Sequence, residues 1–103
     1  MTEAQAVFAA LADPTRRKVL DRLVSDGPTT ATSLASGLPI SRQAVSKHLG
    51  ILHDAGLVER EVVGREAQFR ASPDALEEVR VWIERVGSQW DERLGRLKGR
   101  LGG

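Results

Sequence analysis

The chain has 103 residues, no cysteine and a formal net charge of +1, with 41% hydrophobic and 28% charged residues. These values are typical of one ordinary soluble domain over residues 1–103, and the lack of cysteine excludes disulfides, thiolate catalysis and thiolate metal ligands. No apolar run approaches the roughly 20 residues of a membrane span, and the first residues lack the features of a signal peptide, so we expect a cytoplasmic protein.

Two helices are predicted in the first quarter of the chain. The first, over residues 3–11, has apolar side chains at helical spacing: Ala4, Val7, Phe8 and Leu11. Asp13 is a favoured N-cap and Pro14 is tolerated at the first helical position, so a second helix is expected to begin there and to run to about residue 24. The side chains predicted to face inward from it are Val19, Leu20, Leu23 and Val24.

Residues 29–56 are predicted to form a helix-turn-helix. Thr29 or Thr30 can cap a short helix, which is followed by a turn that contains Gly and Pro. Ser41 is then a good N-cap for the next helix, and Gly56 suits the left-handed conformation that often closes a helix.

The helix after the turn has two different faces. Val45, Leu49 and Leu52 recur at spacings of four and three, which places them on one side. The other side carries Arg42, Gln43, Ser46, Lys47 and Gly50, whose side chains supply two cations, an amide and a hydroxyl, and it has no acid before Asp54. Arg, Gln and Ser side chains bond to base edges and phosphates, so this face is predicted to contact nucleic acid. The alternative is an ordinary solvated face.

Residues 57–71 change from a period of 3.6 to a period of 2, which predicts two strands. Gly64 lies between them and can adopt a positive φ, so the pair is expected to form a β-hairpin. Arg60, Gly64 and Arg65 give the hairpin a cationic edge suited to phosphate, although three nearby glutamates dilute its charge. A purely structural lid is the alternative. A helix-turn-helix followed by a hairpin is the winged helix-turn-helix arrangement.

The last helix is predicted over residues 73–101, and its apolar stripe is too long for a core of this size to cover. Part of the stripe is therefore expected to join the first helix in a symmetric dimer interface. The residues predicted for this interface are Val7, Phe8, Leu11, Val79, Trp82, Ile83, Val86, Trp90 and Leu94. The predicted fold is mainly α with one β-hairpin, in the order of four helices, two strands and a final helix.

Residues of the types used in catalysis and metal binding do not form a site in this sequence. His48 and His53 are five residues apart, about 140° around a helix, and cannot share a metal. Ser46, His48 and Asp54 lie on one helix, where they cannot converge as a catalytic triad. We therefore predict no enzyme, no metal and no cofactor. His48 is expected either to pack at the edge of the core or to donate to a phosphate.

Four motifs in order give the chain a resemblance to a known family. They are Leu11–Arg17 (LADPTRR), Ser41–Leu49 (SRQAVSKHL), Ala55–Val58 (AGLV) and Gly64–Glu66 (GRE) followed by Phe69. Together they resemble the ArsR-type (ArsR/SmtB) family of bacterial repressors over nearly the whole chain. The resemblance implies a winged-helix dimer paired through its first and last helices, with repression by operator binding. It also implies that Ser41, Arg42, Gln43, Ser46 and Lys47 belong to the recognition helix and that Gly64 and Arg65 form the wing tip.

The chain departs from the metal-sensing members of that family. Those members place cysteines in the helix before the turn, where this chain has residues 32–36 (TSLAS), or Asp and His pairs on the last helix, where residues 73–103 contain no His. The resemblance therefore implies a member that does not sense metal.

The sequence as a whole predicts a cytoplasmic homodimer that represses transcription by binding a palindromic operator in double-stranded DNA. The residues predicted to contact DNA are Ser41, Arg42, Gln43, Ser46, Lys47, His48, Arg60, Gly64 and Arg65. Two alternatives remain, a winged-helix module that binds another protein and a sensor of a small molecule near Trp82 and Trp90.

Overall fold

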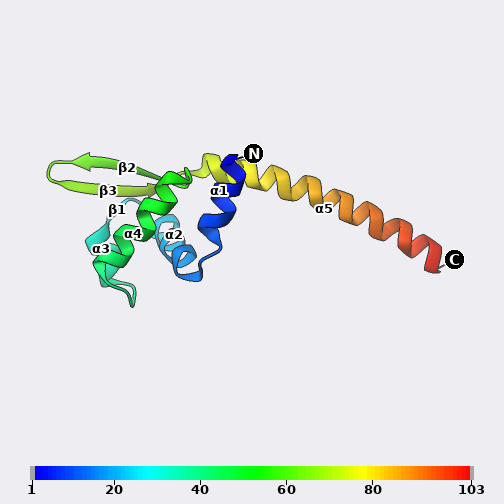
Figure 1. The fold of residues 1–103 in the computed structure, drawn as a ribbon, viewed down its shortest axis with the longest axis horizontal. Helices are drawn as coiled ribbons and strands as arrows, with labels where there is room; N and C mark the ends of the chain where they lie inside the picture. The colour runs from blue at the N-terminus through cyan, green and yellow to red at the C-terminus, as the bar shows by residue number, and fades with distance from the viewer. Residues whose placement is uncertain (1, 103) are drawn as a thin grey trace.

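A computed structural model describes the backbone of residues 2–102 and the side chains of residues 4–72 and 74–99. The elements in chain order are α1 (Thr2–Leu11), α2 (Pro14–Asp26), β1 (Thr29–Thr30), α3 (Ala31–Ser36), α4 (Arg42–Asp54), β2 (Val58–Val63), β3 (Glu66–Ala71) and α5 (Pro73–Gly102). The predicted winged helix-turn-helix is confirmed: α3 and α4 form the helix pair, β2 and β3 form the wing, and α5 follows (Figure 1).

Three helices begin at side chains that the sequence predicted as N-caps. Asp13 caps α2, Thr30 caps α3 and Ser41 caps α4, each by accepting the backbone N–H three residues further on, at 3.0, 3.1 and 3.1 Å. Such a cap stabilises a helix by about 1 kcal/mol because it satisfies a donor that has no partner within the helix. Gly56 has a φ of 80° after the end of α4, as its position in the sequence predicted.

The sheet has one strand more than the sequence predicted. Its order is β1-β3-β2, and all neighbours are antiparallel. The hairpin closes through Gly64 and Arg65, since Val63 pairs with Glu66, and Gly64 has a φ of 64° that few other residues adopt. The extra strand β1 is only two residues long and pairs with β3 some forty positions later, so no local pattern reveals it.

The core lies where α1, α2, α3, α4, the base of the wing and the start of α5 meet. Its buried apolar residues are Val7, Ala10, Val19, Leu20, Leu23, Ala31, Leu34, Val45, Leu49, Leu52, Leu57, Val58 and Val79. The inward positions of α2 are confirmed except Val24, which is 62% exposed. Val24 lies about 40° beyond Leu20 around the helix and about 140° from Val19, which takes it past the edge of the buried stripe.

Arg16 and Arg17 connect α2 to the end of α1. Arg16 Nη1 donates to the carbonyl of Ala10 at 3.1 Å, and Arg17 Nη1 donates to the carbonyl of Leu11 at 2.9 Å. The last carbonyls of a helix have no partner within it, so these bonds close α1 in place of a C-cap glycine.

The second half of α5 extends beyond the rest of the molecule. The radius of gyration is 18.1 Å and the longest dimension is 67 Å, whereas a compact chain of this length has a radius of gyration of about 13 Å. The first half of α5 packs beside α1, and the second half extends away from the body, on the opposite side from the wing (Figure 1). Every described side chain from Ser88 onward is exposed.

Within residues 2–102, the structure contains no helix with both the length and the apolar content that a membrane crossing requires.

Candidate nucleic-acid interface

The core fixes which side of α4 faces solvent. Val45, Leu49 and Leu52 are fully buried, so the helix cannot rotate without exposing them. The residues predicted to contact DNA from this helix are exposed on its other side: Arg42, Gln43, Ser46 and Lys47. Ser41 is exposed at the start of the helix, where its hydroxyl is already engaged as the cap.

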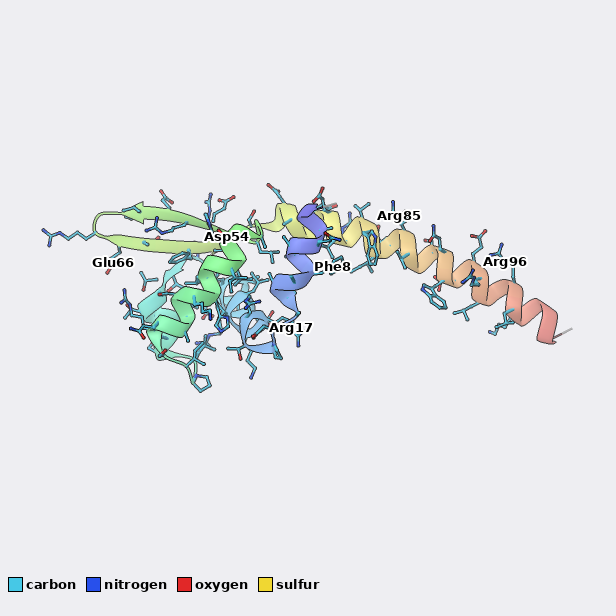
Figure 2. All side chains as sticks on the ribbon, viewed as in Figure 1. Phe8, Arg17, Asp54, Glu66, Arg85 and Arg96 are labelled. Atoms are coloured by element: carbon cyan, nitrogen blue, oxygen red, sulfur yellow. The ribbon has the colours of Figure 1, made fainter. Side chains whose placement is uncertain are left out.

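The wing lies beside α4, and together with α3 they enclose a hollow of about 360 Å³. Its lining residues are Thr30, Ala31, Thr32, Arg42, Ser46, Arg60, Arg65, Glu66, Ala67 and Phe69. The structure thus brings Arg42 and Ser46 of α4 together with the two predicted wing cations, Arg60 and Arg65. Glu66 marks the wing end of this region in Figure 2.

The cations of this region are not neutralised by ion pairs with its glutamates. Glu59, which the sequence suggested would dilute the wing's charge, pairs across the hairpin with Arg70. Among the described residues, no ion pair involves Arg42, Lys47, Arg60 or Arg65. These positive charges are therefore available to an anionic partner.

Thr32 is part of this region, although the sequence gave no indication of it. Its Oγ1 accepts a hydrogen bond from Nε of Arg42 at 3.0 Å, joining the first turn of α3 to the first residue of α4. The two residues are ten positions apart, on different helices, so only the tertiary arrangement of the helix pair reveals the contact.

His48 lies at the inner edge of α4. Its ring is half-buried, and Nδ1 is sheltered from solvent without a hydrogen-bond partner among the described residues. Because α4 packs against α2, this burial agrees with packing of His48 at the edge of the core, and it leaves only Nε2 for any contact with DNA.

The predicted dimer residues fall into three groups. Val7 and Val79 are 1% and 7% exposed, so their side chains are already buried in the core of one chain and offer a partner almost no surface. Phe8 and Trp82 join α1 to α5 by an edge-to-face contact with ring centres 5.3 Å apart, and Leu11 and Val86 are half-buried. Ile83, Trp90 and Leu94 are more than half exposed on α5, along with Leu97, which was not in the predicted set and is 48% exposed.

The comparisons with known proteins agree with this arrangement. Residues 11–61 match the model of a family described as "Helix-turn-helix domain". The chain is 41% identical over 78 residues to the HTH-type transcriptional regulator Rv2034 of Mycobacterium tuberculosis, covering 76% of this chain and 72% of that one. It is 35% identical over 88 residues to the transcriptional repressor SdpR of Bacillus subtilis, covering 85% and 97%.

A solved structure shares almost the whole fold. An ArsR-like transcriptional regulator from Rhodococcus sp. RHA1 is 45% identical, with a TM-score of 0.82 over 95% of this chain and 92% of that one. The chain belongs to the ArsR family. As an ArsR-family protein it is a DNA-binding transcriptional regulator and not an enzyme, and the resemblance read from its four motifs is confirmed.

Proposed function

We propose that this ArsR-family protein is a homodimeric repressor that binds a palindromic operator through α4 and the wing. The observation that supports this most strongly is the acid-free outer face of α4 beside a hollow lined by Arg42, Arg60 and Arg65. Gln and Lys on such a helix can bond to the acceptors and donors in the major groove, and the arginines around the hollow match the phosphate backbone.

The exposed apolar stripe of α5 supports the dimer. Ile83, Trp90, Leu94 and Leu97 are 48–57% exposed and lie on one side of α5, which packs mainly on α1 within its own chain. A second copy related by two-fold symmetry would bury the same stripe on both chains. The two recognition helices would then enter successive major grooves about 34 Å apart, so the operator would be an inverted repeat.

Repression without metal is the mode of regulation that we propose. The relative SdpR is named a transcriptional repressor, and 97% of its length is covered by this chain. Metal sensing would need ligands that the chain lacks, since it has no cysteine and neither of its two histidines lies on α5.

A gel-shift titration against the DNA upstream of the protein's own gene, repeated over a series of salt concentrations, tests the proposal. If the dimer neutralises about 6–10 phosphates, its affinity will fall roughly 10³–10⁵-fold between 50 and 200 mM salt. Binding that is absent at every salt concentration would favour the alternative, a winged-helix module for binding protein. Zinc, cadmium and arsenite, each added to the complex, are expected to leave the shift unchanged.

A second function, the sensing of a small molecule, is favoured by one hollow between α1 and α5. Its volume is about 340 Å³, and it is lined by Ala4, Asp74, Glu77, Glu78, Val81, Trp82 and Arg85. Trp82 lines it and Trp90 does not, so Trp82 alone should report a bound molecule. In a Trp90→Phe variant, Trp82 is the sole tryptophan. A change in its fluorescence as cell extract is added to the variant would detect such a ligand.

A further inference from the structure

We infer that the hollow between α3, α4 and the wing is a binding site for one backbone phosphate of the operator, with Arg42, Arg60 and Arg65 as its ligands. In this site Thr32 is a positioning residue, because it touches Arg42 and not the phosphate. The inference rests on the proposed DNA-binding function and specifies what one part of that surface recognises.

The contact between Thr32 and Arg42 orients one guanidinium group. Nε of Arg42 donates to Thr32 Oγ1 at 3.0 Å. A guanidinium has five N–H donors, so the four on its two terminal nitrogens remain available. Two of these, one on each terminal nitrogen, form the end-on fork that binds two oxygens of one phosphate. Thr32 thus limits the side-chain freedom that binding would otherwise have to remove.

Three arginines line one small hollow. Arg22, Arg70 and Arg80 elsewhere on the surface each pair with a carboxylate. No ion pair involves Arg42, Arg60 or Arg65 among the described residues, although Glu66 lines the same hollow. Three cationic side chains around one hollow repel one another, and a bound anion would offset this repulsion, so the site favours an anionic ligand.

The number and origin of these cations favour a phosphate over a base. One arginine is enough to read a guanine, whose edge offers two neutral acceptors, and two further arginines from the wing would add nothing to that contact. A phosphodiester carries a full negative charge and accepts from several donors at once. Arg42 therefore fixes the position of the protein on DNA, and the base reading falls to the rest of the α4 face, including Gln43 and Lys47.

Two variants of the full-length protein separate these roles. Arg42→Gln removes the charge and keeps a hydrogen-bonding group, so the slope of log affinity against log salt should become shallower by about 2 for a dimer, one per site. Thr32→Val keeps every charge, so the slope should stay unchanged while affinity falls roughly 2–10-fold per protomer, equally for every operator sequence. Thr29→Val is the matched control, because it is the same substitution in β1, outside the lining of the hollow, and should match the wild type.

The base preferences of the variants test whether Arg42 contacts a phosphate or a base. Selection of bound sequences with Arg42→Gln should return the wild-type half-site, whereas a changed base at one position would show that Arg42 reads a base and would overturn it. An unchanged salt slope would also overturn it. If the wild-type protein bound no DNA, the proposed function itself would be wrong. If the wild-type protein bound DNA but its Arg42 variant changed base specificity, only the phosphate site would be wrong.

A free anion is the other source of the same chemistry. The Nε–H resonances of Arg42, Arg60 and Arg65 can be followed by NMR as inorganic phosphate or operator duplex is added. The inference predicts shifts with the duplex at equimolar concentration and none with an equal concentration of inorganic phosphate. Equal shifts with inorganic phosphate alone would identify a site for a free anion and contradict the assignment to the DNA backbone.

Discussion

The body of the molecule and the second half of α5 differ in how far their side chains are buried. In the body, α4 buries Leu49 and Leu52 completely, its start is capped by Ser41, and its polar side is free for a partner. In the second half of α5, every described side chain is exposed, including Trp90 and Leu94. The body therefore has the contacts of a folded unit within one chain, whereas the end of α5 gains a comparable environment only from another molecule.

The largest difference between the two regions should appear on truncating one leucine in each. Leu49→Ala leaves a cavity in the body and should lower the free energy of unfolding by about 2–5 kcal/mol at any protein concentration. Leu94→Ala should have an effect that depends on protein concentration, because it acts through the dimer. Denaturant titrations at two well-separated concentrations measure both. A concentration-independent loss for Leu94→Ala as large as that of Leu49→Ala would show that α5 is part of the body's own core.

Placing a charge on the stripe should separate the two chains while leaving each body folded. Trp90→Glu would bury a carboxylate in the proposed interface, where an unpaired charge is strongly unfavourable, so the dimer should dissociate. Sedimentation gives the mass, and circular dichroism checks that the helices remain. Ser88→Glu is the control, since residue 88 is about 200° from residue 90 around the helix and should leave the mass unchanged. A dimeric Trp90→Glu protein would exclude this stripe as the interface.

Removal of the cap on α4 should affect the recognition helix and not α5. Ser41→Ala removes the hydroxyl that accepts the Ala44 N–H at 3.1 Å, and the protein should lose about 1 kcal/mol of stability. Thermal unfolding gives the size of the loss. Ser41→Asp retains a capping oxygen and should restore most of it, so an equally unstable Asp variant would argue against capping as the cause.

The smallest expected effect is a dependence on pH at the start of α2. The Arg16 N–H is the main cause that lowers the pKa of Asp13 from its ordinary value of 3.8. Because its pKa is lower in the folded protein than in the unfolded chain, the carboxylate stabilises the fold at a pH above its unfolded pKa. This stabilisation is lost as the pH falls through the folded pKa. Asp13→Asn keeps a capping oxygen without the charge, so the Tm advantage of the wild type at pH 7 should shrink at pH 3. An advantage that is constant over this range would contradict the assignment.

The sequence predicted the features of this protein that depend on neighbouring residues. Caps such as Ser41, the period of the α4 core face and the glycine of the wing turn are all local, and each was predicted correctly. Strand β1 was missed because it exists only through pairing with β3. Val24 was misplaced because the periodic pattern does not show where a buried stripe ends.

The sequence predicted which arginines belong to the candidate site but not how they are arranged. Arg42, Arg60 and Arg65 were singled out by their charge and position, and the tertiary fold then placed them around one hollow. The bond from Arg42 to Thr32 could not be predicted, because a threonine on a short helix has no distinguishing pattern in the sequence. The length of the α5 stripe, by contrast, indicated correctly that one chain would not cover it.

Selection of bound sequences from random duplex DNA tests the central claim most directly. A homodimer that reads DNA with two copies of α4 should enrich an inverted repeat whose half-sites are centred about 10–10.5 base pairs apart, one helical turn, or a multiple of that distance. Enrichment of a single unrepeated site, or no enrichment at all, would contradict the account.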